Sequence, residues 1–414
     1  MARPKVLDVE RRRKQLGAWY TPAELVEHLT RLTLGGMRRD RPLTVLDPAC
    51  GDGRFLVAAA QMLGPDCTLI GIDIDPHAVA AARAALPTAT VIEADARLIE
   101  WSRWSVDAVI GNPPFLNQMA SSTSRGGASA VGGGPYADVA AEFLALAAAA
   151  VSPGGRVGLV LPQSILSVRD AAAIRESVAS RASVVHAWWS TRKMFDAAVH
   201  TCALVLEAGG VQGAVARTRG PEFEPCAATS IEQGWGALVI DEPLDHAPVR
   251  AADRPTLGSI ASFALDFRDQ YYGLVDAVGD DRVGPPLVTS GLIEPGRCLW
   301  GERPVRFAKR RFDAPRVDLS ALSPRMQRWA DQRLTPKVLI ANQTRTVEAV
   351  IDREGAWLPS VPVLTCTAQD LDAVMAVLAS PETLAWLRPR AAGSGLSPSA
   401  IRLTPALLGG VPLP

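Results

Sequence analysis

The sequence predicts an α/β domain built on a parallel sheet, followed by a second domain of different character. In the first half of the chain, short runs rich in Val, Ile and Leu alternate with Ala-rich helical stretches. Strands and helices that alternate at this pitch are typical of a parallel sheet covered by helices on both faces. After Gly209 and Gly210, glycine and proline become frequent and the periodicity weakens. The length of 414 residues also suits two domains better than one.

The predicted strands are short apolar runs, as expected for strands buried on both faces. They cover residues 43–47, 69–73, 90–93, 106–110 and 156–161, and a further run at 200–206 is a candidate to close the sheet. The predicted helices between them cover residues 54–63, 76–85 and 136–151. We expect the first domain at residues 1–215, a connecting region at 216–249 and the second domain at 250–414.

Composition excludes several kinds of site. The six cysteines are scattered without a C-x-x-C pair, which excludes the usual zinc spacings and a disulfide framework, so we expect no metal. The basic N-terminus lacks the apolar segment of a signal peptide, and no apolar run is long enough to cross a membrane. We therefore expect a soluble, cytoplasmic protein without a membrane partner.

Acidic residues follow the ends of successive predicted strands. The segment Asp47-Pro-Ala-Cys-Gly-Asp-Gly53 follows the first strand and opens a helix, and its glycines let the backbone turn tightly and approach a ligand. Asp73 ends the second strand, roughly twenty residues later, where open α/β sheets place an acid on ribose hydroxyls. The loop lacks a full phosphate cradle, which favours a nucleoside cofactor without a pyrophosphate. Asp95 ends the third strand run and is positioned to accept from an adenine amine.

The strongest motif is Asn112-Pro-Pro-Phe115, at the end of the fourth predicted strand. Two consecutive prolines make a stiff turn that points its carbonyls outward. The Asn112 side-chain oxygen and the Pro113 carbonyl can both accept from one amine. Such acceptors favour the pyramidal amine whose lone pair attacks a sulfonium methyl, and they stabilise the positive charge that develops. Phe115 offers a flat face on which a base extruded from a duplex can stack.

Taken together, these motifs resemble the amino-methyltransferases of DNA, in the order of their gamma class, and are most similar to TaqI-like N6-adenine DNA methyltransferases. The resemblance covers residues 15–210, through the segments Gly17–Pro22, Asp47–Gly53, Gly71–Pro76, Asp95 and Asn112–Phe115. It extends loosely to the second half through Leu257–Ile260, Lys337–Ile340 and Leu403–Pro414. It implies a Rossmann-like, class I methyltransferase domain dependent on S-adenosylmethionine (SAM), with a C-terminal α+β target-recognition domain.

The resemblance also implies roles for single residues. Two positions depart from the family pattern: Asp52 replaces a common Ser or Thr between the glycines, and Ala96 stands where a bulky aromatic often contacts the cofactor. The target base would be held by Asn112, Pro113 and Phe115, with Phe195 as a second stacking aromatic. The implied cofactor-binding residues are Tyr20, Thr21, Pro22, Asp47, Ala49, Gly51, Asp73, Ile74, Asp95 and Asn112.

A local excess of positive charge marks the second half. The whole chain has 43 basic and 43 acidic residues, but the stretch from Arg297 to Lys337 has 11 basic and 4 acidic residues. Phosphate binding requires such a local field. We expect double-stranded DNA as the partner of a monomeric protein, with a separately encoded restriction endonuclease as a further candidate partner. The expected DNA-binding residues are Arg303, Arg306, Lys309, Arg310 and Arg311.

Other functions remain open at this point. A related amino-methyltransferase could act on cytosine N4, on a protein glutamine or on RNA guanine, although Asn rather than Ser at position 112 favours adenine. The short segment before the first motif favours DNA over a glutamine substrate. A non-catalytic DNA-specificity module is a further alternative, and the intact Asn112–Phe115 motif with Asp73 and Asp95 argues against it.

Overall fold

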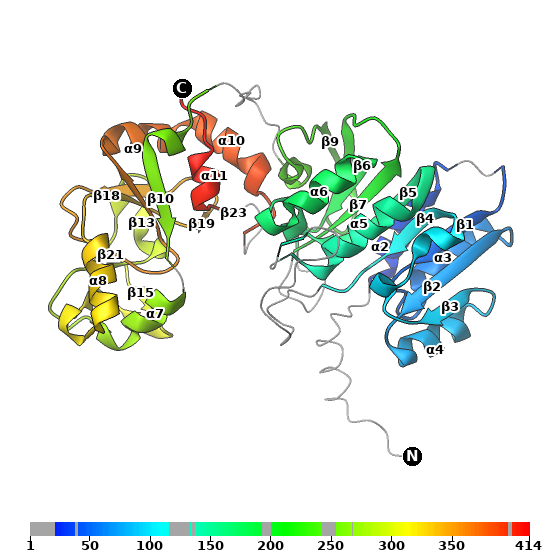
Figure 1. Ribbon diagram of the computed structural model, residues 1–414, viewed down its shortest axis with the longest axis horizontal. Helices are drawn as coiled ribbons and strands as arrows, with labels where there is room; N and C mark the ends of the chain where they lie inside the picture. Colours follow the sequence, from blue (N-terminus) through cyan, green and yellow to red (C-terminus); the bar gives the residue numbers. More distant parts are fainter. Residues whose placement is uncertain are drawn as a thin grey trace, which may run out of the picture. The chain divides into compact units, whose positions relative to one another are not determined.

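The structure is a computed structural model that describes residues 21–37, 40–115, 133–134, 137–192, 200–241, 254–266, 268–395 and 400–414. The chain divides into two compact units, Met1–Asp241 (unit 1) and Glu242–Pro414 (unit 2), shown in Figure 1. Each unit has hydrophobic clusters of its own. Within the described ranges, no helix is both long enough and apolar enough to span a membrane.

The described part of unit 1 contains a nine-stranded mixed sheet with the order β3-β2-β1-β4-β5-β7-β6-β8-β9. It can be followed in Figure 1 from the blue strands β1–β3 to the green strands β6–β9. The five strands from β3 to β5 are parallel, as predicted, whereas β7 is antiparallel to both β5 and β6. The bounds are β1 (Leu43–Asp47), β2 (Cys67–Asp73), β3 (Thr90–Glu93), β4 (Val106–Gly111), β5 (Val151–Pro162), β6 (Ala182–Trp189), β7 (Thr201–Ala208), β8 (Val215–Arg219) and β9 (Glu224–Thr229).

Helices cover both faces of this sheet because successive strand residues point to opposite sides. Val45 packs in the cluster formed with α2, α3 and α4, while its neighbour Leu46 packs in the cluster formed with α5 and α6. Helix α5 begins later than the predicted start at 136, because Asp138 caps it by accepting from the Ala140 N–H at 2.9 Å. The bounds are α2 (Ala23–Leu34), α3 (Arg54–Leu63), α4 (Pro76–Ala85), α5 (Val139–Ala150) and α6 (Ala172–Ala179).

The run at 200–206 does not close the sheet, contrary to expectation. It forms β7, which lies between β5 and β6, and β8 and β9 continue the sheet beyond β6. The sequence pattern did not indicate β6, because the half-buried His186 interrupts its apolar run. Trp188 and Trp189 at the end of β6 are both buried, as expected for core residues.

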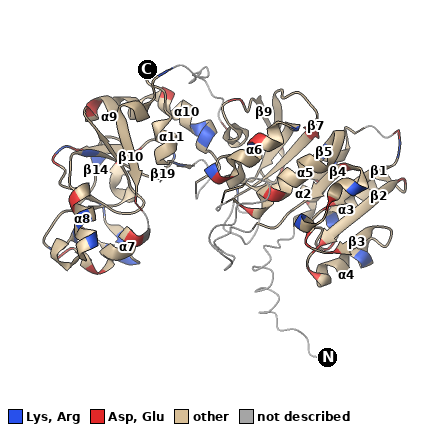
Figure 2. Cartoon of the chain, in the orientation of Figure 1, with Lys and Arg blue, Asp and Glu red and all other residues tan. Residues whose placement is uncertain are grey.

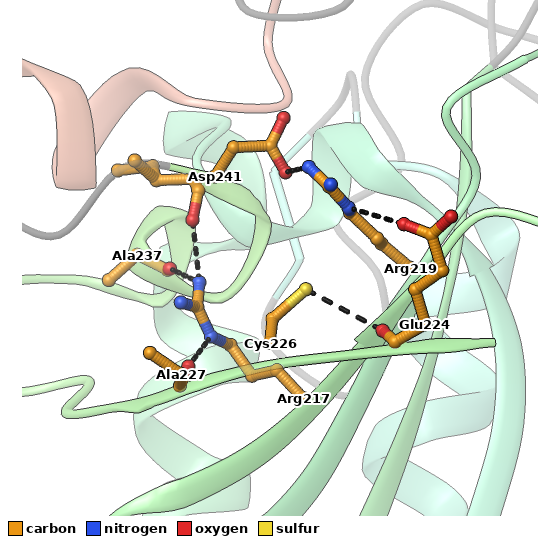
Figure 3. Close-up of polar contacts among 8 residues, drawn as sticks. Arg217, Arg219, Glu224, Cys226, Ala227, Ala237 and Asp241 are labelled. Atoms are coloured by element: carbon orange, nitrogen blue, oxygen red, sulfur yellow. Dashed lines mark hydrogen bonds and ion pairs between the residues drawn. The ribbon is translucent and has the colours of Figure 1, made fainter.

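Two arginines of β8 attach the last described segment of unit 1 to the sheet, as Figure 3 shows. Arg219 lies 3.2 Å from Glu224 and 3.0 Å from Asp241, forming an ion pair with each. The buried Arg217 guanidinium donates to three backbone carbonyls, which belong to Ala227 (2.7 Å), Ala237 (3.0 Å) and Ile240 (2.7 Å). The chain up to Asp241 is therefore part of the packed edge of this unit.

A chain of polar side chains connects helix α2 with β6 and β8. Arg31 can only donate, so the His28 Nδ1, 3.1 Å from Arg31 Nη2, accepts and the proton of His28 lies on Nε2. His28 Nε2 then donates to the Thr218 hydroxyl at 3.3 Å, and this hydroxyl donates to His186 Nε2 at 3.0 Å. Both histidines are neutral in this arrangement. The pKa of each is lowered to about 4, mainly by burial, and for His28 nearby His186 and Arg31 contribute to the shift.

We expect these histidines to make unit 1 sensitive to acid. Between pH 6.5 and about 4, the unfolded histidines bind protons that the folded ones do not, so the free energy of unfolding falls as the pH decreases through this window. A His28→Gln, His186→Gln variant should therefore lose less stability than the wild type between about pH 7 and about pH 5, as measured by urea unfolding. The exposed His77→Gln control should follow the wild type. An equal pH response of the double variant and the wild type would contradict the assignment.

Unit 2 has the predicted α+β character. Its described part contains a four-stranded antiparallel sheet with the order β10-β22-β18-β20, together with short two-stranded pairs. The sheet strands are β10 (Ala261–Leu265), β18 (Lys337–Ile340), β20 (Ala349–Asp352) and β22 (Leu364–Ala368). The paired short strands are β11 (Val278–Gly279) with β17 (Arg316–Val317), β12 (Leu287–Val288) with β21 (Leu358–Pro359), β13 (Ile293–Glu294) with β14 (Arg297–Cys298), β15 (Val305–Phe307) with β16 (Arg310–Phe312), and β19 (Gln343–Thr344) with β23 (Ile401–Arg402). The helices are α7 (Arg268–Leu274), α8 (Pro324–Arg333), α9 (Leu371–Ala379), α10 (Pro381–Ala391) and α11 (Pro405–Gly409).

The three segments of unit 2 that carry the loose resemblance come together in the fold. The Leu257 N–H donates to the Val411 carbonyl at 2.7 Å, so the segment at 257–260 pairs with the C-terminal segment. The Asn342 side-chain amide, just beyond β18, donates to the Leu403 carbonyl at 2.7 Å. These contacts attach the C-terminal segment to the sheet of unit 2.

A buried ion pair connects β18 and β20. Lys337 and Asp352 are 1% and 3% exposed, and Lys337 Nζ lies 2.6 Å from Asp352 Oδ2. Asp352 also accepts from the backbone N–H groups of Ala356 at 3.0 Å and Trp357 at 2.9 Å. Burial lowers the pKa of Lys337, although its bond to Asp352 opposes this shift. The carboxylate thus satisfies a buried cation and two backbone donors.

Candidate active site

Polar side chains of four neighbouring strands lie at one edge of the sheet of unit 1. The strands β3, β2, β1 and β4 are adjacent and parallel, so their carboxyl ends point to the same edge. Asp47 ends β1 and Asp73 ends β2, while Asp95 and Asn112 follow the ends of β3 and β4. The structure therefore brings together the residues that the sequence places at successive strand ends.

Asp47 is a buried carboxyl with unused acceptor capacity. It is 1% exposed, and its Oδ1 accepts from the Ala49 N–H at 3.1 Å. Its Oδ2 is buried without a hydrogen-bond partner among the described residues. Burial raises the pKa of Asp47 well above its ordinary value. A Cβ added at Gly111 would lie 2.5 Å from Asp47 Oδ1, so this carboxyl lies directly beside the backbone that leads into Asn112.

Asp73 holds the glycine turn in place. Its Oδ2 accepts from the Gly51 N–H and its Oδ1 from the Asp75 N–H, both at 2.8 Å. Burial raises the pKa of Asp73 despite these bonds. Gly51 has a φ of +55°, in the left-handed region that favours glycine. A carboxylate has about four acceptor positions, so Asp73 retains capacity for further donors. The next side chain, Ile74, is 56% exposed.

Asp95 is already engaged by Arg97, a residue that sequence reasoning did not single out. Asp95 Oδ1 accepts from the Arg97 backbone N–H and from Nε, both at 3.0 Å, and Oδ2 accepts from Nη2 at 2.7 Å. These bonds lower the pKa of Asp95. Arg97 also lies 3.6 Å from Glu142 of α5. Ala96 is buried, so it offers no exposed face to a ligand.

Arg54 is a second residue that the sequence analysis missed. Its Nε and Nη2 donate to the two Asp52 oxygens at 2.9 and 2.7 Å, and its Nη1 donates to the Thr21 carbonyl. Burial opposes ionisation of Asp52, but the contacts with Arg54 outweigh it and lower the pKa. Thr21 is buried and is followed by Pro22, which precedes α2. An aspartate between the glycines thus orients the arginine that connects this turn to Thr21. Tyr20 lies outside the described residues.

The asparagine–proline turn lies at the end of β4. Pro113 is buried, and Asn112 and Phe115 are half-buried. Phe115 packs against the hydrophobic clusters on both faces of the sheet, which fixes the turn relative to the strands. Phe195, the expected second aromatic, lies outside the described residues and stays a prediction. In the described ranges, no group of three His, Cys, Asp or Glu residues could hold a metal ion.

This arrangement of strand-end acids and an asparagine–diproline turn agrees with the comparison with known families. The profile of the family described as N-6 DNA Methylase matches residues 9–216. The chain belongs to the N-6 DNA methylase family. Membership confirms the predicted relationship, and the mixed α/β sheet confirms the predicted fold class.

Individual relatives are more distant. The type II methyltransferase M.TthHB8I of Thermus thermophilus is 23% identical over 389 residues, which cover 88% of this chain and 83% of the relative. The type II methyltransferase M.XamI of Xanthomonas campestris pv. amaranthicola is 35% identical over 113 residues, but these cover 25% of this chain and only 20% of that relative. The solved structure of the type IIL restriction-modification enzyme MmeI in complex with DNA has a TM-score of 0.55 and 16% identity, and covers 92% of this chain and 63% of that one. This last similarity concerns the fold.

Proposed function

We propose that this chain is a site-specific DNA methyltransferase that transfers a methyl group from SAM to N6 of adenine in double-stranded DNA, as part of a restriction-modification system. The observation that carries the proposal is the close approach of Gly111, directly before the Asn112 turn, to the Asp47 carboxyl, in a chain of the N-6 DNA methylase family. The site for the target amine would therefore lie next to the site for the ammonium group of SAM.

The residues of the strand ends fit SAM. The buried Asp47 Oδ2, which has no partner among the described residues, suits the ammonium group of the methionine part. Asp73 retains acceptor positions for ribose hydroxyls, and the exposed Ile74 offers apolar surface to the adenine ring. Asp95 Oδ2 receives one bond from Arg97 and keeps a position for the adenine amine. When bound, SAM supplies an electrophilic methyl group on a sulfonium.

The Asn112 turn would activate the target amine by position rather than by a strong base. The side-chain oxygen of Asn112 and the carbonyl of Pro113 accept its two hydrogens and draw the nitrogen out of conjugation with the ring. The same oxygens stabilise the positive charge that the nitrogen gains during transfer. Phe115 stacks on the base, which must leave the duplex to reach this turn at a cost of a few kcal/mol.

Product analysis tests the proposal. The purified chain is incubated with labelled SAM and duplexes of varied sequence, and the digested nucleosides are separated by mass spectrometry. We expect N6-methyladenine, confined to a short sequence context. N4-methylcytosine as the product, or label in protein or RNA but not in DNA, would overturn the proposal.

We expect Asp47→Asn to weaken SAM binding without unfolding unit 1. The amide keeps an oxygen for the Ala49 N–H but removes the charge that would meet the ammonium. Loss of such a charged hydrogen bond predicts an increase of about 10- to 100-fold in the dissociation constant, measured by calorimetry. Asp66→Asn makes the same charge change at an exposed position of unit 1 and is the control. Wild-type affinity in Asp47→Asn would contradict the assigned role.

A further inference from the structure

The two short strands β15 and β16 form a basic hairpin in unit 2. One face is apolar and packed, because Val305, Phe307 and Phe312 are buried. On the other face Arg306 and Arg311 lie directly opposite each other in the register, and both are exposed. Like charges in directly opposed positions destabilise a strand pair. The outer face of the hairpin therefore holds two cations side by side at the expense of its own stability.

The turn of the hairpin is fixed by its surroundings. Ala308 and Lys309 have φ values of 49° and 65°, so two residues with side chains adopt the left-handed conformation that a tight hairpin turn demands. The Ala308 N–H donates to the Tyr271 hydroxyl at 3.0 Å, and the rings of Tyr271 and Phe307 are 4.8 Å apart. The Arg310 guanidinium lies 5.1 Å from the centre of the Phe312 ring. These contacts fix the conformation of the hairpin that carries the exposed cations.

Unlike several other cations of the basic stretch, those of the hairpin have no acidic partners among the described residues. Figure 2 shows basic and acidic positions interspersed along the chain. Arg303, an expected DNA-binding residue, is paired with Glu294. In contrast, the four hairpin cations have no carboxylate within ion-pair distance in the part of the chain that the structure describes; they are Arg306, Lys309, Arg310 and Arg311. Other ion-paired arginines of unit 2 include Arg297 with Glu302, Arg333 with Asp266 and Arg353 with Asp372.

An exposed tyrosine lies next to Tyr271, the residue that contacts the hairpin turn. Tyr272 of α7 is 68% exposed. Its ring stands edge-on to that of Tyr271, at 5.5 Å and 86°, and Tyr271 in turn holds the hairpin turn. Exposed tyrosines beside unneutralised cations are suited to contact the sugar and base surfaces of a nucleic acid while the cations contact its phosphates.

We propose that the β15–β16 hairpin and Tyr272 form a ribbon that binds the phosphate backbone of duplex DNA, and that Arg303 is not part of it. The proposal rests on the proposed function and names the surface that holds its substrate. Arg306 and Arg311 provide paired positive charge, Lys309 extends it at the turn, and duplex DNA has a phosphate about every 1.7 Å of its axis. A two-stranded ribbon also fits the width of the major groove.

Salt-dependent binding of a labelled duplex tests this surface in the full chain. For Arg306→Ala, Arg311→Ala we expect the slope of log affinity against log salt to fall by about two, and the affinity at low salt to fall by more than about tenfold. Arg306→Lys, Arg311→Lys should keep the wild-type slope. Tyr272→Ala should weaken binding several-fold without changing the slope, because no charge is lost. Arg297→Ala, Arg353→Ala removes the same charge from paired positions of unit 2 and should bind nearly as the wild type does.

Three results would overturn the proposal: an unchanged slope in the Arg306/Arg311 alanine variant, an equal loss in the Arg297/Arg353 control, or tighter binding of single-stranded RNA than of duplex DNA. Thermal unfolding provides the check on folding, and the alanine variant should be at least as stable as the wild type because a like-charge pair is removed. SAM binding should be unaffected. If the slope falls as expected but no adenine becomes methylated, the ribbon stands and the proposed function fails.

Discussion

Asn112→Ala is expected to reduce methyl transfer to adenine by at least about a hundredfold, with little change in folding. The substitution removes one of the two acceptors proposed for the target amine, and loss of one preorganised partner of a developing charge costs about 2.7–4 kcal/mol of the barrier. Asn112 is half-buried at the end of β4, outside the sheet itself, so the strands should persist. Single-turnover transfer with saturating SAM and duplex measures the effect.

The conservative variant separates chemistry from packing. Asn112→Asp has the same shape and still presents an oxygen, so it should retain more activity than Asn112→Ala. Calorimetry on both variants reports the SAM affinity. Activity within about tenfold of the wild type in Asn112→Ala would remove the asparagine from the proposed mechanism, because such a loss corresponds to only about 1.4 kcal/mol.

Asp352→Ala is expected to destabilise unit 2 by about 3–5 kcal/mol, since it leaves the buried Lys337 ammonium without its anion. It also removes the acceptor of the Ala356 and Trp357 N–H groups. Urea unfolding followed by tryptophan fluorescence measures the change, because Trp329 belongs to the hydrophobic cluster beside this pair and Trp357 packs against it.

Unit 2 offers a matched control for this prediction. Asp372 forms an ion pair with Arg353, at 2.6 Å, but the two side chains are 67% and 64% exposed. Asp372→Ala should therefore cost far less stability than Asp352→Ala, because an exposed ion pair contributes little. Equal losses in the two variants would contradict the role assigned to burial. A double replacement, Lys337→Met with Asp352→Leu, should recover part of the stability, but not the part that depends on the two backbone donors.

The parallel half of the sheet was predictable because strands that are buried on both faces are visible in the sequence as short apolar runs. The runs that became β1, β2, β4 and β5 are mostly apolar, and polar residues of the site lie at or just beyond the ends of β1 to β4. The contacts of Arg54 and Arg97 were not predictable in the same way. Arg54 reaches the Thr21 carbonyl 33 positions earlier in the chain, and Arg97 turns back on Asp95. Whether each guanidinium contacts these partners or water depends on the tertiary packing, which the sequence alone does not show.

Unit 2 was less predictable for a related reason. Many of its strands are two or three residues long, too short for any alternation to be visible. Its basic stretch was evident, but the sequence could not show which charges are neutralised. Arg333 pairs with Asp266 from a distant segment, whereas Arg306 and Arg311 face each other without an acid among the described residues. Tertiary contacts thus determine which cations of the basic stretch are neutralised by an acidic side chain.

The attachment of the last segment of unit 1 to β8 bears on how the catalytic half could be produced alone. A fragment ending at residue 215 would lack the hydroxyl of Thr218 that His28 and His186 share, and would lack Arg217 with its three carbonyl partners. It would also leave β6 as an unprotected sheet edge, a surface prone to aggregation. A stop codon placed after Asp241 keeps these contacts and is the better choice for expressing this half by itself.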